Sequence, residues 1–600
     1  MCGILAVASG TGPISRDAVA RGLSAIAHRG PEGQDIAIRT TVAGTAAMAH
    51  CRLSIFDLSD AGKQPMSDAR ARSIIFNGSI FNWPELRQEL VAAGYDFFTE
   101  TDTEVILAAY DKWGTDCVTR FNGFWSFVLL DEGGAEPFLF FSRDRFGIKP
   151  LYFGLAGKQT ILSSEIAGIL AYLDERPNVD LPELARQIVF QLGDDSERTL
   201  YRNIYEVEPA TSGTLGLRDG KMRRWRYWAL CDRPFEGNDD DVLNRFTELF
   251  EDSVRIRLRA DREVALTLSG GIDSSAIAIA ISRASKVKVR AFTSHFPGRH
   301  DIDETYYAEI VAKRFGLSHV LVQPDLENLA ENERQLTKHQ ELMYGSFSLL
   351  VNWYVIKEIQ KHGVRIFLTG QGGDELFLGY ERYYTPYLRG LLRRTPTLFA
   401  RELLKAGRHS RLGVAGVLKF LIYFSSGYVR AKRYRRDSAQ VYSAEILAAA
   451  RGAPSSLPAN LFELHAREIC GQQLRHLLRY DDRTSAAFGT EGRPAFLDYR
   501  LVEFAASLGW QHKIRDGWTK YIIRRYLDRA GLPEIAWRRH KFGYAAPTLD
   551  WTTRLSAQGH FSKSAGARYL RPDLDFPSMP DRMRFPVYNL LSTSSEMNWR

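Results

Sequence analysis

The stretch Leu268-Ser269-Gly270-Gly271-Ile272-Asp273-Ser274-Ser275 decides the fold class of the second half of this 600-residue chain. It follows a short apolar run, Val264 to Leu268, and opens a run with helical spacing, Ser275 to Ala284. Two glycines let the backbone turn tightly, so that successive N–H groups and the positive end of the helix point at one anion. The pattern predicts a strand–loop–helix unit whose loop binds a phosphate chain. The alternative is an ordinary glycine-rich turn with a capping serine or aspartate.

Strand and helix patterns go on alternating beyond this loop. The sequence predicts strands over Val287–Ser294, Val320–Val322 and Arg365–Thr369, and helices over Glu304–Phe315 and Leu349–His362. Such alternation is typical of βαβ units, whose strands pair in parallel. We therefore expect an α/β domain over residues 240–600, with a doubly wound parallel sheet and additional helices.

A second glycine-rich stretch, Gly370-Gln371-Gly372-Gly373-Asp374-Glu375, follows the predicted strand Arg365–Thr369. Loops at the carboxyl ends of parallel strands share one crevice, where ligands bind. Asp273 and Asp374 are then expected to converge, and two carboxylates facing a polyphosphate are a common way to hold Mg²⁺. Taken alone, the stretch also fits an ordinary turn at a helix start.

The first part of the chain, to about residue 225, has a different pattern. Short apolar or alternating runs such as Gly3–Ala8 and Trp125–Asp131 are separated by Gly and Pro, which predicts a β-rich unit with a few helices. The polar, turn-rich segment Trp228–Asp241 is the predicted linker. The expected domains are therefore residues 1–225 and 240–600.

Composition places the chain among ordinary globular proteins. With 45% hydrophobic and 25% charged residues it does not fit a disordered, collagen-like or coiled-coil protein. Five scattered cysteines without a CxxC pair argue against a disulfide framework or a zinc site. No secretory signal is visible, and the longest apolar run, Leu412–Phe424, is interrupted by Lys419 and too short to span a bilayer. We expect a cytoplasmic protein without a membrane span.

Positive charge is concentrated in one segment. The net charge is +8, and the segment from Arg382 to Arg436 contains 14 Lys or Arg but one acid, Glu402. Nucleic acid or a membrane surface would suit such a segment, whereas the simpler interpretation is a set of solvated amphipathic helices. We expect the helices, and no nucleic-acid partner.

The two glycine-rich stretches resemble the synthetase domain of the glutamine-dependent asparagine synthetase family, in which SGGxDSS is the PP-loop of ATP pyrophosphatases. Further matches are Asp303-Glu304, Glu491-x-Arg493-Pro494-x-Phe496-Leu497-Asp498, Lys520-Tyr521 and Trp537-Arg538-x-x-Lys541. The resemblance implies that a carboxylate attacks the α-phosphorus of ATP, which gives an acyl-adenylate and pyrophosphate. It also implies Mg²⁺ at Asp273 and Asp374, and Lys541 as a cation that neutralises developing charge. The implied ATP-binding residues are Leu268, Ser269, Gly270, Gly271, Asp273, Ser274, Ser275, Thr293 and Gly370, with Gln371, Glu375 and Glu491 as further substrate-site candidates.

Cys2 is significant only if Met1 is removed. Its free α-amine, with an ordinary pKa of about 8, would then serve as the base for its own thiol. A cysteine at position two is by itself more often just a small residue after the initiator.

The surrounding sequence resembles class II (N-terminal nucleophile, Ntn) glutamine amidotransferases. The matching stretches are Met-Cys-Gly-Ile, His28-Arg29-Gly30-Pro31, Arg52-Leu53-Ser54-Ile55, Gln64-Pro65-Met66, Asn77-Gly78, Thr101-Asp102-x-Glu104 and Arg143 to Tyr152. The resemblance implies an αββα sandwich of antiparallel sheets in which Cys2 attacks the side-chain amide of glutamine. It further implies that Asn77 and Gly78 form the oxyanion hole, that Arg52 binds the substrate carboxylate, and that Asp102 pairs with its ammonium.

Three positions depart from the family pattern. The family's Asn-Gly-Glu reads Ser79 at its third position, which leaves Asp102 as the expected ammonium partner. The last position of His-Arg-Gly-Pro-Asp is Glu32. The Gly-Glu-Gly of asparagine synthetases has Gln371, and glutamine is no base although it forms hydrogen bonds.

Three functions follow as hypotheses. The first is an ATP- and glutamine-dependent amide ligase that uses glutamine and a carboxylic acid, aspartate the leading candidate, with ammonia passing through an interior tunnel. The second keeps the ATP chemistry but closes a ring with the substrate's own amine, as β-lactam synthetases and lasso-peptide cyclases do. The third is a non-catalytic anion-binding protein, which the intact PP-loop disfavours. The oligomeric state, a homodimer included, stays open.

Overall fold

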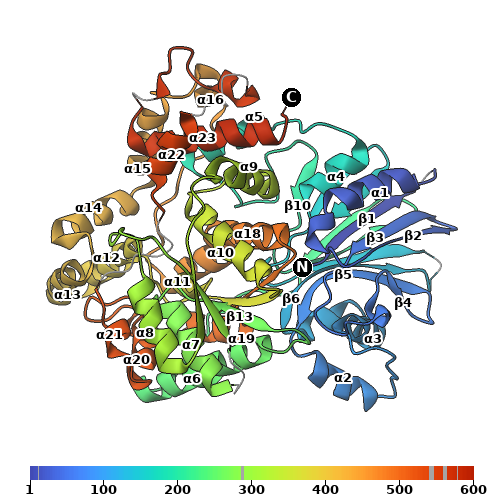
Figure 1. Ribbon diagram of the computed structural model, residues 1–600, viewed down its shortest axis with the longest axis horizontal. Helices are drawn as coiled ribbons and strands as arrows, with labels where there is room; N and C mark the ends of the chain where they lie inside the picture. The colour runs from blue at the N-terminus through green and yellow to red at the C-terminus, as the bar shows by residue number, and fades with distance from the viewer. Residues whose placement is uncertain are drawn as a thin grey trace.

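The computed structural model describes residues 1–10, 12–134, 136–284, 289–539, 546–557, 564–576 and 579–599 (Figure 1). Its N-terminal part contains two six-stranded sheets, both antiparallel. In sheet order, the first comprises β10 (Ile204–Glu206), β8 (Tyr152–Ala156), β9 (Gln159–Ser163), β1 (Gly3–Ser9), β3 (Gly44–Cys51) and β2 (Gln34–Thr41). The second comprises β12 (Met222–Arg226), β11 (Thr211–Gly216), β7 (Phe138–Arg143), β6 (Gly123–Asp131), β5 (Arg72–Ile80) and β4 (Met66–Ser67).

The two sheets face each other across an apolar core, and helices cover their outer faces. Along β1, Ile4 and Ala6 pack against the second sheet, whereas Leu5 and Val7 pack under helices, as the two-residue period of a strand requires. The covering helices are α1 (Arg16–Ala25), α4 (Ile166–Leu173) and α5 (Leu181–Phe190) on one side, and α2 (Trp83–Val91) and α3 (Asp102–Trp113) on the other. This arrangement confirms the expected αββα sandwich.

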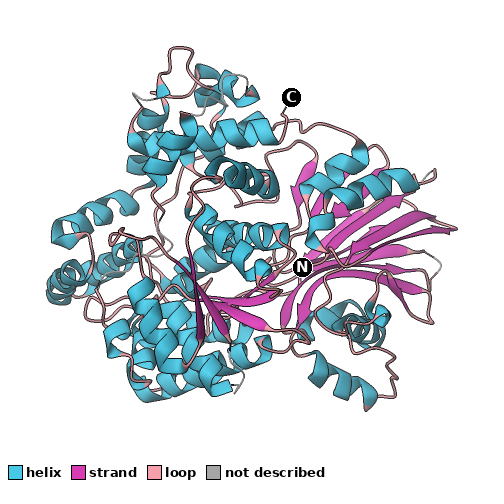
Figure 2. Ribbon diagram, in the orientation of Figure 1, coloured by secondary structure: helices cyan, strands magenta, loops and turns pink. Residues whose placement is uncertain are grey.

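The C-terminal part is built on a five-stranded parallel sheet (Figure 2). Its strands, in sheet order, are β15 (Ser318–Val322), β14 (Arg290–Ser294), β13 (Val264–Thr267), β16 (Ile366–Thr369) and β17 (Glu491–Pro494). Helices cover both faces: Leu266 of β13 packs into one core and its neighbour Ala265 into the other. The expected doubly wound sheet is confirmed, although β17 belongs to a stretch for which no strand was predicted.

The helices of this part follow in chain order. They are α6 (Asp239–Arg257), α7 (Ile272–Ala284), α8 (Thr305–Phe315), α9 (Leu329–Gln340), α10 (Ser348–Lys361), α11 (Gly373–Leu376), α12 (Tyr384–Arg394), α13 (Pro396–His409), α14 (Gly413–Ser425), α15 (Gly427–Ser438), α16 (Ala444–Ala449), α17 (Leu461–Cys470), α18 (Gln472–Ala487), α19 (Tyr499–Ser507), α20 (Tyr521–Arg529), α21 (Pro533–Ala536), α22 (Thr548–Ser556) and α23 (Asp581–Glu596). Short 3₁₀ helices span Ala27–Arg29, Asp60–Gly62, Gly114–Arg120, Glu381–Tyr383, Trp510–His512 and Ala565–Tyr569. Within the described ranges, none of the helices has the length and apolar character needed to cross a bilayer.

The connecting segment between the two parts is shorter than predicted. Helix α6 already begins at Asp239, because Asn238 forms a capping box with Asp241. The preceding residues lie along α19: the Trp228 indole donates to Glu503, and the Phe235 N–H donates to the carbonyl of Ser507. The segment is therefore packed against the C-terminal part.

Buried charges join the two parts at α18. Arg29 lies 2.6 Å from Glu165 and 2.9 Å from Asp482 of α18. The next residue, Arg483, lies 2.8 Å from Glu165 and 2.7 Å from Glu341, and all five side chains are almost fully shielded from solvent. Through Arg29 and Glu165, which follows β9, this network holds the N-terminal part against α18, the helix that leads into β17.

Candidate functional site

A pocket in the N-terminal part gathers four of the residues predicted to handle glutamine, whereas the fifth, Asn77, is not among its lining residues. Cys2 precedes β1, Arg52 follows β3, Gly78 lies on β5, and Asp102 begins α3. The lining residues are Cys2, Arg52, Leu53, Ser54, Ile55, Phe56, Gly62, Gln64, Phe76, Gly78, Thr101, Asp102, Thr103 and Glu491. We call this the Cys2 pocket.

Asn77 provides an amide with no partner beside the Cys2 pocket. The side chain is fully buried, and neither its oxygen nor its nitrogen has a hydrogen-bond partner among the described residues. Such a group costs about 1–3 kcal/mol unless something else binds it. At the neighbouring Gly78, a Cβ would lie 2.2 Å from the carbonyl oxygen of Phe124, so only glycine fits.

Backbone contacts position the thiol and the arginine. The Leu53 N–H donates to the Cys2 sulfur, with an N···S distance of 3.5 Å. The Arg52 guanidinium donates to the carbonyls of Asp57 (2.5 Å) and Ser59 (2.6 Å), which fixes its planar group at the pocket wall. Burial raises the pKa of the Cys2 thiol, so the thiolate needs a nearby base or cation.

Two carboxylates line the Cys2 pocket, although the sequence indicated one. The Asp102 side chain accepts from the Ile80 N–H at 2.9 Å. The second carboxylate is Glu491 of β17, which accepts from the Ser79 hydroxyl at 3.1 Å and from Arg493 at 2.9 Å. The small side chain of Ser79 leaves room for Glu491, so a residue of the C-terminal part helps to form the pocket.

Titration of Asp102 gives the first prediction. Burial raises its pKa to about 7, and the charge of Glu491 contributes to the rise. Below this pKa the carboxyl is neutral and cannot pair with the ammonium of glutamine. We expect this loss alone to lower kcat/KM for glutamine hydrolysis about tenfold per pH unit below pH 7. Initial rates at low glutamine test this, and Asp102→Asn should be slow throughout and fall one power of ten less per pH unit, because only the proposed base, the Cys2 amine, then titrates. A profile that stays flat down to about pH 5 would contradict it.

The second site lies where β13 and β16 end. The Ser269 hydroxyl accepts from the Gly271 N–H, and the Ser274 hydroxyl accepts from the Ser269 N–H, both at 3.2 Å, which shapes the loop before α7. Gly270 has φ +68°, and a Cβ there would lie 2.6 Å from the Ala308 nitrogen. The buried Ser275 hydroxyl has no partner among the described residues. The loop therefore has the compact form and the spare donor that a phosphate requires.

Asp273 and Asp374 converge as predicted from the topology. The Lys520 ammonium lies 2.5 Å from Asp273 and 2.8 Å from Asp374, and joins the two carboxylates. Two carboxylates this close beside a phosphate-shaped loop fit Mg²⁺, whose ligands are oxygens. Gly370 and Thr293 lie at the same edge: a Cβ on Gly370 would lie 3.0 Å from that of Asp273, and the Thr293 hydroxyl donates to the Leu268 carbonyl.

Gln371 has a carboxylate neighbour that sequence patterns did not reveal. Its side chain lies close enough to Asp481 of α18 to lower the pKa of that carboxyl, which accepts from the Asn352 amide at 3.3 Å. Burial raises the pKa of Asp481 to about 7. The buried Glu375 accepts from the Tyr380 hydroxyl at 2.7 Å, and its pKa is raised to about 7 by burial and by Asp374.

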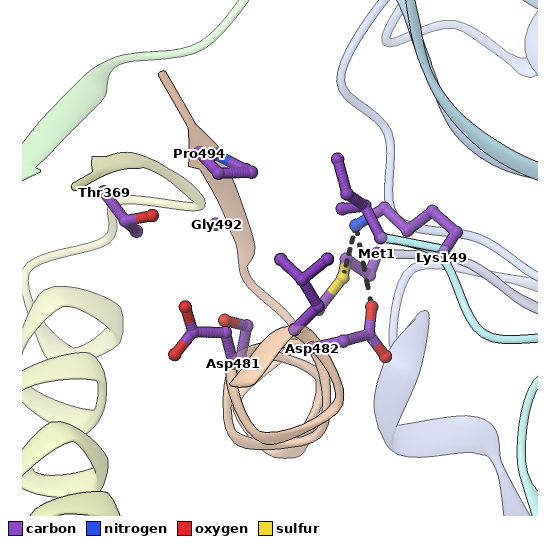
Figure 3. A pocket seen from close by; sticks show the side chains of 10 residues that line it. Met1, Lys149, Thr369, Asp481, Asp482, Gly492 and Pro494 are labelled. Atoms are coloured by element: carbon purple, nitrogen blue, oxygen red, sulfur yellow. Dashed lines mark hydrogen bonds and ion pairs between the residues drawn. The ribbon is translucent and has the colours of Figure 1, made fainter. Parts of the chain in front are cut away.

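A cavity lies between the two sites (Figure 3). Met1 and Lys149 lie at one end and Thr369, the last residue of β16, at the other. Asp481 and Asp482 point in different directions from α18, and the Lys149 ammonium contacts the Met1 sulfur (2.6 Å) and Asp482 (3.7 Å). The remaining lining residues are Ile148, Leu478, Ser485, Gly492 and Pro494. Since Glu491 lines the Cys2 pocket and Gly492 the cavity, β17 runs between them.

The sequence anticipated most of these residues, with clear exceptions. Lys541 lies outside the described residues. Asp481 was missed, because its proximity to Gln371 depends on how α18 packs against the sheet. Lys520 had been noted only as part of a motif, and its position in the left-handed region (φ 53°) before α20 was not predictable.

The fold and the two sites define a glutamine-dependent ligase that forms amides. Comparison with known proteins gives the family: the profile described as asparagine synthase matches residues 245–573, and that described as glutamine amidotransferase domain matches residues 1–228. The chain belongs to the asparagine synthase family.

Two curated relatives come from Bacillus subtilis. Its asparagine synthetase (glutamine-hydrolyzing) 3 is 30% identical over 85% of this chain and 83% of the relative. Its asparagine synthetase (glutamine-hydrolyzing) 1 is 27% identical over 88% and 83%. A protein named amidase chry2 from Gibberella zeae is 26% identical over 88% of this chain and 85% of the relative. Relatives that match most of the chain therefore carry more than one name.

Proposed function

We propose that the enzyme releases ammonia from glutamine at Cys2 and joins it to a carboxylic acid that ATP has activated at the PP-loop, with aspartate as the first candidate acid. The cavity between the two sites is the observation that carries this proposal. Its lining extends from Met1, next to Cys2 in the chain, to Thr369, next to the glycine-rich loop of Gln371, and this extent supports a route for ammonia between the two sites.

In the Cys2 pocket, the thiol of Cys2 attacks the side-chain carbonyl of glutamine once Met1 has been removed. The free amine takes the thiol proton, the C–N bond breaks to release ammonia, and water then frees glutamate. The Asn77 amide and the Gly78 N–H would bind the oxyanion, a contribution of about 2.7–4 kcal/mol per donor. Arg52 would bind the α-carboxylate. Asp102 and Glu491 would share the ammonium.

At the second site, a carboxylate oxygen of the acid bonds to the α-phosphorus of ATP and the bond to pyrophosphate breaks. The loop of Ser269 to Ser275 would hold the pyrophosphate. Asp273 and Asp374 would hold Mg²⁺, which neutralises phosphate charge when bound. Lys520 keeps these two carboxylates together, and Lys541 is proposed as the cation for the adenylation step.

In the last step, ammonia bonds to the acyl carbon, the bond to AMP breaks, and the nitrogen loses a proton. Gln371 is no base, but its neighbour Asp481 is a carboxylate whose pKa burial raises to about 7, and we propose that it takes that proton. Asp481 thus supplies the carboxylate that Gln371 lacks.

Aspartate is the first candidate because the relatives from Bacillus subtilis are named asparagine synthetases. The amidase name of the relative from Gibberella zeae, and the presence of Gln371, support a test of other acids. Ring closure by a substrate's own amine is the second candidate, favoured by Ser79 and Gln371 and disfavoured by Cys2 and by the unpartnered amide of Asn77, whose neighbours Phe76 and Gly78 line the Cys2 pocket.

The test is a reaction with ATP, Mg²⁺, aspartate and amide-¹⁵N glutamine, followed by mass spectrometry. We expect labelled asparagine together with an equal amount of AMP, from protein verified to lack Met1. Labelled ammonia without asparagine would reject aspartate as the acid and keep the glutaminase. Neither product would reject the ammonia route and favour ring closure.

A further inference from the structure

The outer faces of α12 to α15 expose large apolar side chains. Leu404 of α13 is 63% exposed, Ile422 of α14 is 67% exposed and Tyr428 of α15 is 76% exposed. Leu392, Leu418 and Val429 of the same helices are also exposed. Helices α12, α13 and α14 pack together into a lobe at the edge of the molecule (Figure 1). We call the exposed residues of α12 to α15 the lobe surface.

Apolar and basic side chains alternate on this surface with helical spacing. On α13 the exposed residues Arg401, Leu404 and Arg408 recur every three or four positions. On α14 the exposed residues are Ala415, Leu418, Lys419 and Ile422. Ala415 is three and four positions from Leu418 and Lys419, and Ile422 is four and three positions from them, so all four lie on one face of the helix. Each helix therefore presents one stripe to solvent that is both apolar and positively charged.

The lobe surface carries no exposed carboxylate to balance its cations. The one acid between Arg382 and Arg436, Glu402, is buried and accepts from the Gly517 N–H. Some cations are engaged, such as Lys405 with Asp516. Among the described residues of this segment, the side chains of five cations have neither an ion pair nor a hydrogen bond: Arg393, Arg394, Arg408, Lys419 and Lys432. Net positive charge therefore remains available to a partner.

We propose that the lobe surface docks the enzyme onto anionic phospholipid membranes. Cations bind anionic headgroups, and apolar side chains of amphipathic helices enter the boundary between headgroups and acyl chains. Nucleic acid would satisfy the charge and stack on Tyr428, but it would leave the exposed Leu404 and Ile422 without an apolar partner. An anionic lipid membrane is the partner that binds both the cations and the exposed apolar side chains.

The lobe packs against the C-terminal part close to the second site. His409 at the end of α13 stacks on Trp518 with ring centroids 3.9 Å apart, two residues before Lys520. A membrane bound at the lobe would therefore lie next to the part of the chain that holds the second site. The inference does not depend on which acid is the substrate.

Flotation with lipid vesicles tests the proposal. We expect the full-length enzyme to float with vesicles that contain a third phosphatidylglycerol in phosphatidylcholine, and not with phosphatidylcholine alone. High salt should weaken the binding. The pair Leu404→Ser with Ile422→Ser and the pair Arg408→Glu with Lys419→Glu should each reduce binding about tenfold or more.

The matched control combines Leu155→Ser with Lys158→Glu, an exposed apolar residue and an exposed lysine of the N-terminal part. It should bind like the wild type, and all variants should hydrolyse glutamine at the wild-type rate, which shows that they are folded. Absent binding to anionic vesicles, or equal binding by all variants, would overturn the proposal. So would binding only to a single-stranded oligonucleotide or an acidic protein, or self-association that the lobe variants abolish.

Discussion

Replacing Cys2 with alanine should abolish glutamine-dependent amide synthesis while ammonium chloride still supports it. The thiol is the atom proposed to bond to the glutamine carbonyl, and removing a nucleophile costs about four or more orders of magnitude in rate. The second site and the cavity are unchanged by the substitution, so ammonia supplied from solution still meets the activated acid. The expected result is a split between the two nitrogen sources.

Glutamate release and amide formation are measured side by side, with glutamine or ammonium chloride as the nitrogen source. Cys231→Ala is the matched control, because Cys231 is an exposed cysteine far along the chain from the pocket. Glutamate release that survives in the Cys2 variant would contradict the proposed nucleophile. Loss of activity with both nitrogen sources would instead indicate a folding defect, which thermal melting reveals.

Replacing Asp374 with asparagine should impair the second site and spare the first. One of the two carboxylates proposed for Mg²⁺ is lost, while its neighbour Asp273 keeps its contact with Lys520. We expect the rate of AMP formation to fall about a thousandfold, because the charge on the phosphates is then poorly neutralised. Glutamine hydrolysis at the Cys2 pocket should continue.

AMP formation with aspartate, or with the acid identified by ¹⁵N transfer, is the measurement. The control is Asp301→Asn, which removes an exposed carboxylate paired with Arg299. If the Asp374 variant forms AMP at the wild-type rate, Asp374 does not hold the metal. A variant that also loses glutamine hydrolysis would show instead that the two sites are coupled through the cavity.

The residues that sequence patterns identified are those whose role follows from local spacing. The loop of Ser269 to Ser275 lies between a strand and a helix within a few positions, so its geometry follows from chain order. The convergence of Asp273 and Asp374 follows from one further rule, that the ends of parallel strands meet. The αββα sandwich was expected from a resemblance rather than from spacing.

The roles that sequence patterns missed arise from packing between distant segments: Glu491 is a sequence candidate, but for the second site, and Asp481 is no candidate. Glu491 enters the Cys2 pocket because β17 adds to the edge of the parallel sheet, hundreds of positions from Ser79. Asp481 meets Gln371 only because α18 packs against β17, the strand beside β16. No periodicity along one chain encodes such a contact. Both residues lie near positions where the sequence departs from its family, Ser79 and Gln371.

The buried network at α18 limits how freely the two halves of this enzyme can be recombined. Arg483 forms ion pairs with Glu165 of the N-terminal half and Glu341 of the C-terminal half. A half transplanted from a relative would have to bring a carboxylate to the same place, since a buried charge that loses its partner costs about 3–5 kcal/mol. We therefore expect the two halves to evolve together. A substitution at one side of the buried network limits which substitutions the other side tolerates.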